Sequence, residues 1–399
     1  MKIQQSTLFA VGTFLLSLVL AACAADPAPV AAQQQVQAPV VAPPLVLDSA
    51  LARRLERFDQ YFTETLRLQG APGAAVVVVK DSNIVFCKGY GLRAVGSRDS
   101  VNAHTVFRIG SLSKGFAGVL TGVLVQDSLF KWTDPVVEHY PDFALRDNKQ
   151  AARVNVMHLL SHTSGLPYHA YTNLVEAGYT IPQIVSQFPK VKLFGKEGET
   201  YCYQNAAFSV VGEVMYAETG KTYEALLTEK IFQPAGMRDA SATYEDLLAC
   251  TDKALPHNQS GCCGWVCTPI SEEYYNAAPA GGVNASIYDM GQWLKVLLGF
   301  RPDIVTPATL DTVFTPRIRT ERERHIFGRW ARHKESWYGL GWRILRLDDR
   351  DLVYHGGLVN SYRGEIAVDR KSGIAVCILF NGPTAMASDC VPMFFDLFK

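Results

Sequence analysis

The pattern of apolar and polar residues predicts a helix and two strands at the N-terminal end of the fold. After Asp48, apolar residues recur at helical spacing and predict an amphipathic helix: Leu51, Leu55, Phe58 and Phe62. Residues 74–80 and 84–88 are two short apolar runs separated by a polar turn, which predicts a β-hairpin. The N-terminal end should therefore combine one helix with a pair of strands.

The C-terminal end mirrors this arrangement, whereas the middle of the chain has helical periodicity. Three strands and a last helix are predicted at 352–355, 364–369, 374–380 and 391–398. Helices are predicted at 111–125, 156–161, 206–218, 222–231 and 287–298. Strands at both ends and helices between them predict an α/β (α+β) fold. We expect an antiparallel sheet flanked by N- and C-terminal helices, with an inserted all-α domain.

These predictions place one globular domain at 48–399. Its α/β part comprises 48–108 and 336–399, and its mainly helical part comprises 109–335. The stretch from 317 to 334 is rich in arginine and is interpreted as a solvated loop, with a basic strip beside a cleft as the alternative.

The first 47 residues have a different pattern, typical of export. Lys2 precedes an uncharged apolar run at 8–20, too short to span a membrane, which predicts a signal peptide over 1–23. Its end, Leu-Ala-Ala followed by Cys23, resembles a bacterial lipobox, which implies lipidation of Cys23. Ordinary cleavage with a soluble product is the alternative. Residues 24–47 are rich in Pro, Ala and Gln and predict an extended tether.

This N-terminal pattern predicts a lipid-anchored protein of the cell envelope. Ala24 rather than aspartate follows the cysteine, and by resemblance to Gram-negative lipoproteins this favours the outer membrane, facing the periplasm. The 38 basic and 38 acidic residues give a formal net charge of +0. Binding to nucleic acid usually needs a basic surplus, so we expect no nucleic-acid partner.

Nine cysteines raise the questions of disulfides and of zinc. Four of them are close in the sequence: Cys250, Cys262, Cys263 and Cys267. Export permits local disulfides among them. A zinc site is disfavoured, because the cluster has no C-x-x-C pair and His257 has no second histidine at finger-like spacing. Cys87 and Cys377 lie in apolar runs and are interpreted as buried thiols.

The segment around Ser111 and Lys114 carries the clearest chemistry. Residues three apart share one helix face, so the hydroxyl and the amine should be neighbours. Serine needs a nearby base, and lysine, with an ordinary pKa of about 10.4, becomes one only when burial or nearby positive charge lowers that value. The surrounding helix is otherwise uncharged, which favours a buried Lys114. By itself the tetrad also fits a helix cap at Ser111 followed by a solvated lysine.

Two further segments complete the candidate site. Tyr203 is interpreted as a general base held as a phenolate by a neighbouring ammonium, and Asn205 as a hydrogen-bonding partner of substrate and of Lys114. Residues 355–357 (HGG) end a predicted strand, where Gly356 and Gly357 let a substrate approach the backbone. The N–H of Leu358 would join that of Ser111 as an oxyanion hole. A simple turn is the alternative for the two glycines.

Taken together, these segments resemble the serine β-lactamase and penicillin-binding-protein superfamily, nearest to class C β-lactamases with the related DD-peptidases and esterases. The resemblance covers the chain from about Asp48 onward. The segments that carry it are 111–114, 156–166, 203–205, 280–282, 338–342 and 355–357.

The resemblance implies a role for each residue at these positions. Ser111 would be the nucleophile, Lys114 and Tyr203 would form the base pair, and Asn205 would orient the substrate. His355 would occupy the third motif, with no metal and no organic cofactor. One departure matters: class C enzymes usually have lysine at that motif, where it attracts the substrate carboxylate. The histidine here, followed by Leu358 in place of a small hydroxyl residue, weakens the case for rapid β-lactam turnover.

The expected function is therefore acyl transfer to water on β-lactams or on D-peptides of the cell wall. A carboxylesterase and a slowly deacylating penicillin-binding sensor are the alternatives. His158 and His162 form an H-x-x-x-H pair, but the glutamate of metalloproteases is missing after His158, so both are interpreted as structural. An α/β-hydrolase would need a G-x-S-x-G elbow, which the sequence lacks.

Overall fold

The computed structural model describes residues 47–261, 263–328 and 330–398. The predicted signal peptide, Cys23 and all of the tether except its last residue lie outside the described residues. None of the described helices combines the length and apolar character needed to cross a membrane.

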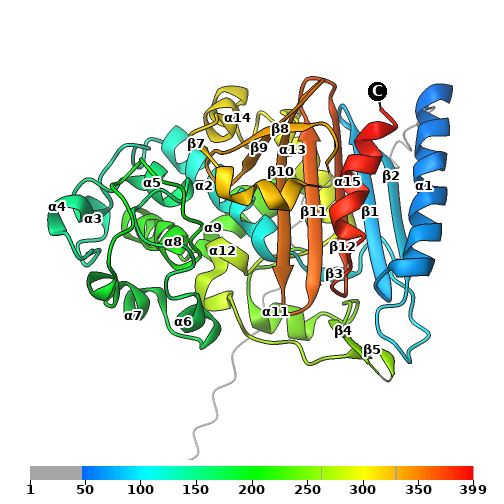
Figure 1. Cartoon of the computed structure of the whole chain (residues 1–399), viewed down its shortest axis with the longest axis horizontal. Helices are drawn as coiled ribbons and strands as arrows, with labels where there is room; N and C mark the ends of the chain where they lie inside the picture. The colour runs from blue at the N-terminus through cyan, green and yellow to red at the C-terminus, as the bar shows by residue number, and fades with distance from the viewer. Residues whose placement is uncertain (1–46, 262, 329, 399) are drawn as a thin grey trace, which may run out of the picture. The chain divides into compact units, whose positions relative to one another are not determined.

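The central feature is a sheet of eight antiparallel strands in the order β2-β1-β12-β11-β10-β9-β8-β7 (Figure 1). Its strands are β1 (Gly73–Lys80), β2 (Asn83–Gly91), β7 (Ile318–Arg319), β8 (His333–Tyr338), β9 (Arg343–Leu347), β10 (Asp351–Val359), β11 (Tyr362–Asp369) and β12 (Ile374–Phe380). β1 pairs with β12 along its whole length, so the two ends of the domain meet inside one sheet. The predicted antiparallel sheet built from both termini is confirmed.

Two helices cover one face of this sheet, as the sequence predicted. They are α1 (Ser49–Gln69) and α15 (Ala387–Asp396), and they lie side by side next to the strands in Figure 1. Phe58 and Phe62 of α1 are fully buried, and Phe58 packs edge-on against Phe394 of α15. The apolar side of the predicted amphipathic helix is thus its contact with the sheet.

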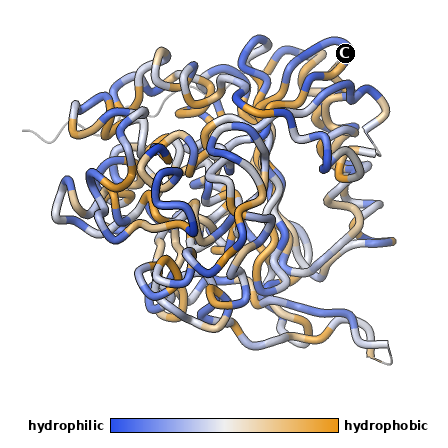
Figure 2. The backbone as a smooth tube through the Cα atoms, turned by 60° about the vertical axis from the view of Figure 1, so that its left-hand side comes forward, coloured by the Kyte–Doolittle hydropathy of each residue, from blue (hydrophilic) through white to orange (hydrophobic). Residues whose placement is uncertain are grey.

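The opposite face of the sheet packs against α13 (Ile287–Leu297), which joins it to the helical part. In that part, α2 (Ser113–Gln126) and α8 (Ala206–Thr219) are buried along most of their length. The remaining α-helices are α3 (Val136–His139), α4 (Asn148–Ala151), α5 (Val156–Leu160), α6 (Thr172–Glu176), α7 (Ile181–Val185), α9 (Tyr223–Leu227), α10 (Gln233–Ala235), α11 (Tyr244–Ala249), α12 (Ala278–Gly281) and α14 (Pro307–Phe314). Figure 2 shows hydrophobic and hydrophilic residues interleaved along most elements, the pattern of elements with one buried side.

Short 3-10 and π turns and two small sheets complete the fold. The turns are η1 (Gly110–Leu112), η2 (Phe188–Lys190), η3 (Thr228–Phe232), η4 (Tyr275–Ala277) and η5 (Glu321–Phe327). The small sheets pair β3 (Val106–Arg108) with β6 (Asn284–Ser286), and β4 (His257–Ser260) with β5 (Gly264–Cys267). The helix predicted at 222–231 is therefore α9 continued by the π turn η3.

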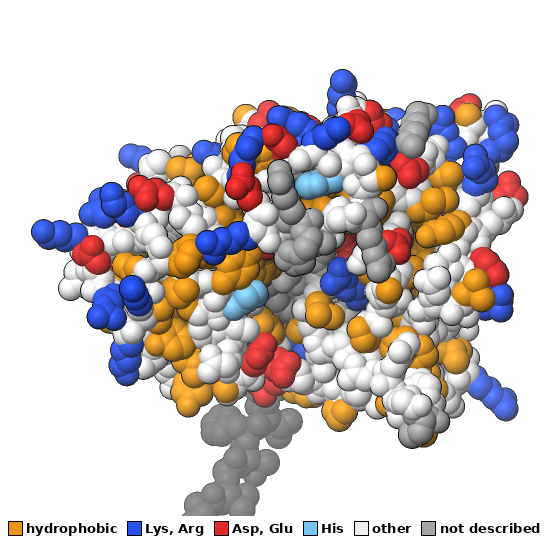
Figure 3. All heavy atoms as spheres, in the orientation of Figure 1, with side chains coloured by type: hydrophobic (Ala, Val, Ile, Leu, Met, Phe, Trp, Pro, Cys, Tyr) orange, Lys and Arg blue, Asp and Glu red, His pale blue; other side chains and the backbone are white. Residues whose placement is uncertain are grey.

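The arginine-rich stretch and the cysteine cluster differ from their interpretations. Residues 317–334 were interpreted as a solvated loop, but they form β7, η5 and the start of β8, because this stretch completes one edge of the sheet. Cys250 and Cys267 are free thiols, so neither makes the local disulfide considered for it. Cys377 is a buried thiol, as predicted. Figure 3 shows positive and negative side chains interspersed over one face, in keeping with the balanced charge.

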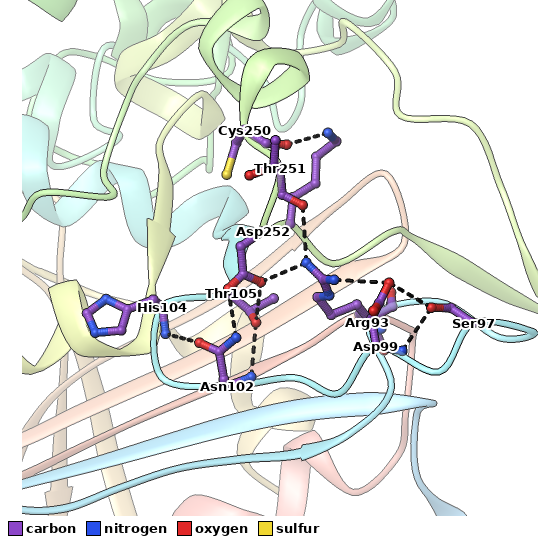
Figure 4. Close-up of polar contacts among 11 residues, drawn as sticks. Arg93, Ser97, Asp99, Asn102, His104, Thr105, Cys250, Thr251 and Asp252 are labelled. Carbon is purple, nitrogen blue, oxygen red and sulfur yellow. Dashed lines mark hydrogen bonds and ion pairs between the residues drawn. The ribbon is translucent and has the colours of Figure 1, made fainter.

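A hydrogen-bonded network fixes the approach to the nucleophile segment (Figure 4). The Asp252 carboxylate accepts hydrogen bonds from Asn102 Nδ2 at 2.7 Å and Thr105 Oγ1 at 2.8 Å, and it pairs with Arg93 Nη1 at 3.1 Å. The backbone of Val106, at the start of β3, bonds to the carbonyl of Asp252 at 2.8 Å. The network thus ties the loop after β2 to the strand that leads into Ser111.

Replacing Asp252 by alanine should lower the free energy of unfolding by about 1–3 kcal/mol, because three donors lose their acceptor. Chemical denaturation measures this value. Alanine at Asp349, an exposed residue between β9 and β10 that pairs with Arg332 and Arg350 at the surface, is the control and should change stability by less than about 1 kcal/mol. Equal effects of the two substitutions would show that the network does not stabilise the fold.

Candidate active site

Ser111 lies in the turn η1, at the junction between β3 and α2. β3 is buried, and Gly110 after it adopts a positive φ of 54°, a backbone conformation that favours glycine. A Cβ at Gly110 would lie 2.9 Å from the backbone nitrogen of Leu358, so glycine also permits the close approach of η1 to β10. The turn presents the Ser111 hydroxyl at the start of the buried helix α2.

Lys114 is fully buried one turn along, on the same side as Ser111. Its Nζ lies 3.3 Å from Ser111 Oγ and donates hydrogen bonds to Asn205 Oδ1 and to the carbonyl of Ala280, both at 2.8 Å. Burial, with a smaller contribution from the Arg343 guanidinium, holds the pKa of Lys114 well below its usual range. A neutral amine that gives two N–H groups to these acceptors keeps its lone pair for the Ser111 proton. The arrangement allows Lys114 to accept a proton from Ser111 Oγ.

Tyr203 approaches Ser111 from the other side, where its phenol donates to Ser111 Oγ at 2.9 Å. Burial raises the pKa of Tyr203 to about 12, although Arg343 and the bond to Ser111 oppose this rise. The phenolate interpretation is therefore wrong, because desolvation outweighs the nearby positive charge and Tyr203 rests as a neutral phenol. In this state Tyr203 is a hydrogen-bond donor to the Ser111 hydroxyl.

The strand β10 forms the wall opposite η1. It pairs with β9 only as far as Tyr354, so residues 355–359 extend past the end of that neighbour. A Cβ at Gly357 would lie 2.2 Å from the carbonyl of Ile109 and 3.2 Å from the nitrogen of Ser111, which explains the need for glycine there. Leu358 is 57% exposed and lines the same cavity as Ser111. This wall therefore brings the backbone of β10 close to η1 and exposes the apolar side chain of Leu358 to the cavity.

His355 lies behind that wall and is 1% exposed. Its Nδ1 donates to the carbonyl of Gly356 at 2.7 Å, and its Nε2 accepts from the hydroxyl of Tyr338 at 2.9 Å. Burial, followed by the charge of the Arg343 guanidinium, holds the pKa of His355 well below its usual range. His355 is therefore neutral and orients β10, and it does not line the cavity.

The cavity has a volume of about 220 Å³ and gathers most of the predicted residues. It is lined by Ser111, His169, Tyr203, Asn205, Tyr274, Ala280, Gly281, Gly356, Gly357, Leu358, Val359 and Arg363. The sequence interpretation missed His169, Tyr274 and Arg363, which come from separate segments outside the motifs. Tyr274 accepts a hydrogen bond from Asn205 Nδ2 at 3.2 Å and so fixes that amide beside Lys114.

A buried ion pair behind Tyr203 was also missed. Arg343 of β9 and Glu323 of η5 form this pair, with side chains 9% and 7% exposed. Glu323 also accepts hydrogen bonds from the hydroxyls of Tyr168 at 2.6 Å and Tyr201 at 3.2 Å. The Arg343 guanidinium lies 5.6 Å from the ring centroid of Tyr203. The sequence contained one indication that Arg343 lies near the site, because this residue directly follows the motif at 338–342.

The two histidines of the H-x-x-x-H pair have structural contacts. His158 Nδ1 accepts from the backbone N–H of Asn155 in a capping box, and His162 Nδ1 accepts from the backbone N–H of Gln204 at 3.1 Å. Their structural interpretation is confirmed. Within the described residues, no group of three or more His, Cys, Asp or Glu side chains could hold a metal ion.

Comparison with known proteins identifies a family and several similar chains. The family described as Beta-lactamase matches residues 58–392. The chain is 26% identical to the Unguisins hydrolase ungD' of Aspergillus campestris over 330 residues, covering 80% of this chain and 60% of that protein. It is 22% identical to Protein flp of Staphylococcus aureus over 331 residues, covering 82% of this chain and 63% of that protein. The chain thus spans somewhat less than two thirds of the length of these relatives.

A solved structure has the same fold. The octameric penicillin-binding protein homologue from Pyrococcus abyssi superposes with a TM-score of 0.74 at 24% identity, covering 86% of this chain and 78% of that one. The match supports the predicted architecture of a sheet with an inserted helical part.

Proposed function

Because the chain belongs to the beta-lactamase family, we propose that it is a serine hydrolase that forms an acyl-enzyme on Ser111. One observation carries the proposal: a serine hydroxyl lies between a buried amine, with Lys114 Nζ at 3.3 Å, and a phenol, with Tyr203 Oη at 2.9 Å. This is the arrangement of a nucleophile with its own base and acid. The name of the fungal relative, a hydrolase, supports the reaction class.

In the first half of the reaction, Lys114 Nζ takes the proton of Ser111 Oγ while Oγ attacks the substrate carbonyl carbon. The negative charge on the carbonyl oxygen is stabilised by the backbone N–H groups of Ser111 and Leu358. The bond to the leaving group then breaks, and Tyr203 supplies the proton that the leaving atom needs. In the second half, the Tyr203 phenolate takes a proton from the water that attacks the Ser111 ester. Lys114 returns its extra proton to Ser111 Oγ as the acyl bond breaks, which releases the acid and restores all three side chains.

The proposed substrates are amides of the β-lactam or wall D-peptide type. A carboxylesterase is the second candidate, and a specific observation favours it: His355 is neutral and turned away from the cavity, so the third motif offers no cation. A slowly deacylating sensor would share the first half-reaction. The proposed location is the cell envelope, through a lipid on Cys23.

The test compares the purified wild type with Ser111→Ala on a fluorescent penicillin, nitrocefin and p-nitrophenyl butyrate. We expect an acyl adduct or turnover that Ser111→Ala abolishes and that Ser186→Ala, an exposed serine on another surface, retains. Intact-mass measurement detects the adduct. Nitrocefin turnover would identify a β-lactamase, a persistent adduct a peptidase or sensor, and ester turnover alone an esterase. Equal activity in Ser111→Ala would refute the proposal.

A further inference from the structure

A second cavity lies among the helices α8, α9 and α12, which are neighbours in the helical part (Figure 1). It has a volume of about 260 Å³. A Cβ at Gly212 of α8 would lie 3.4 Å from Pro279 Cγ of α12, so any larger residue there would fill part of this gap. Of the described residues that line it, none also lines the cavity at Ser111. The two cavities are therefore separate.

Two carboxylates of this second cavity lack a positive partner. Glu213 of α8 and Glu224 of α9 both line it and are half-buried, whereas its described lining includes no lysine, arginine or histidine. Neither carboxylate makes a hydrogen bond or an ion pair with a residue that the structure describes. Burial, followed by the charge of Glu224, raises the pKa of Glu213 above its ordinary value. The cavity thus carries negative charge without a counter-ion.

Two further polar groups of the same cavity have no partner. Tyr223 is 4% exposed, and its hydroxyl makes no hydrogen bond within the described part of the chain. Asn276 donates through Nδ2 to the carbonyls of Val175 at 2.9 Å and Tyr179 at 2.7 Å, which fixes the amide and leaves its buried Oδ1 without a described partner. Both residues line the cavity with the two glutamates. Because buried polar atoms are almost always hydrogen-bonded, these two atoms point to a bound ligand.

The polar groups and the walls of the cavity fit an organic cation. An ammonium group has three N–H donors, and acceptor oxygens are available on both glutamates, on Asn276 and on the hydroxyl of Tyr223. The aromatic ring of Tyr216 also lines the cavity, and such rings attract cations. Ile181 and Pro279 add apolar surface. Rings and apolar side chains suit the carbon chain of an organic cation better than the water shell of a metal ion.

We propose that this cavity binds an alkylammonium group, with the ammonium held by Glu213 and Glu224 and its carbon chain against Ile181 and Pro279. The ammonium would belong to a free diamine or to the side chain of a lysine in a peptide, since both present the same group. The site is distinct from the one at Ser111 and does not depend on the proposed acyl-enzyme.

A ligand-detected NMR titration of the purified protein tests this site with three probes. Putrescine presents the ammonium on a free diamine, Nα-acetyl-lysine methylamide presents it on a peptide unit, and butanediol is the neutral analogue of putrescine. We expect saturable binding of at least one cation, at least about tenfold tighter than that of butanediol, as for a charge-assisted hydrogen bond. The tighter of the two cations identifies the source of the ammonium.

Glu213→Gln combined with Glu224→Gln removes both charges and should weaken binding of the responding cation at least about tenfold. Glu138→Gln is the matched control, because Glu138 is an exposed glutamate of α3 in the same helical part and lies outside the cavity; it should retain the wild-type affinity. Tyr223→Phe removes only the hydroxyl and should weaken binding about threefold. Thermal unfolding without ligand shows that each variant is folded, and none should be less stable, since the groups removed have no described partner.

No saturable binding of either cation, equal affinity for butanediol, or unchanged affinity in the double glutamine variant or in Tyr223→Phe would overturn the proposal. Calcium that displaces putrescine at a lower concentration than putrescine itself requires would identify a metal site and would also overturn it. Hydrolysis and its loss in Ser111→Ala are measured separately, so failure of either proposal leaves the other standing.

Discussion

Replacing Lys114 by methionine should lower kcat/KM for p-nitrophenyl butyrate by about 10² to 10⁴, the usual contribution of a general base. Methionine keeps an unbranched apolar side chain in a fully buried position, but its thioether is not basic enough to take the Ser111 proton. Steady-state hydrolysis measures the effect, and thermal unfolding shows whether the variant remains folded. Lys114→Arg is the control for charge: it restores a cation without a base and should remain inactive.

The pH dependence of the wild type gives a second measure of Lys114. The base must be deprotonated, so kcat/KM should fall as the pH drops through the pKa of Lys114. Burial and the Arg343 charge hold this pKa well below its usual range, so activity should persist at pH values well below the ordinary pKa of lysine. The phenol of Tyr203, whose pKa is raised to about 12, should cause no loss until strongly alkaline pH. An activity that rises only near the ordinary pKa of lysine would contradict this assignment.

Replacing Arg343 by methionine should lower the free energy of unfolding by about 3–5 kcal/mol, the usual cost of leaving a buried charge unpaired. Glu323 would keep its hydrogen bonds from Tyr168 and Tyr201 but would lose its counter-ion. Chemical denaturation followed by circular dichroism measures the change. The loss exceeds that expected for an exposed pair, because both side chains are almost inaccessible to water.

A double variant tests whether the loss of stability comes from the carboxylate of Glu323 left unpaired. Arg343→Met with Glu323→Gln removes both charges, and it should recover much of the stability that the single variant loses. A surface pair, Arg301 with Asp303, is the matched control, and Arg301→Met should cost less than about 1 kcal/mol. If Arg343→Met were as mild as Arg301→Met, the buried pair would contribute little to the fold.

The helices, the strands and the antiparallel sheet follow from local patterns. The Ser111 and Lys114 pairing could be predicted because helical spacing alone brings them together, and the structure places their side-chain atoms 3.3 Å apart. Tyr203 came from the family resemblance, since no local rule joins residues so far apart in the chain. Its protonation state was predicted wrongly, because burial cannot be read from the motif.

The missed residues share one physical cause, the register of distant segments. Arg363 lines the cavity because the pairing of β11 with β10 places it opposite Leu358, a register that the sequence does not reveal. Glu323 lies in an arginine-rich stretch with the composition of a solvated surface, yet η5 buries it against Arg343. Sequence composition indicates how solvated a segment is on average. Whether one charged side chain is buried depends instead on an oppositely charged partner elsewhere in the fold.

The pairing of β1 with β12 sets the order in which the central sheet can be completed during folding. Ala74 lies opposite Phe380, so the first strand gains its inner neighbour only when almost the whole chain is present. Closing such a long loop carries a large entropic cost and slows folding. Because β12 lies between β1 and β11, the β1–β2 hairpin cannot join the rest of the sheet before β12 is present. A nascent or C-terminally clipped chain would hold Ser111 in η1 next to Lys114 in α2, yet would lack the finished sheet that supports the opposite wall of the cavity.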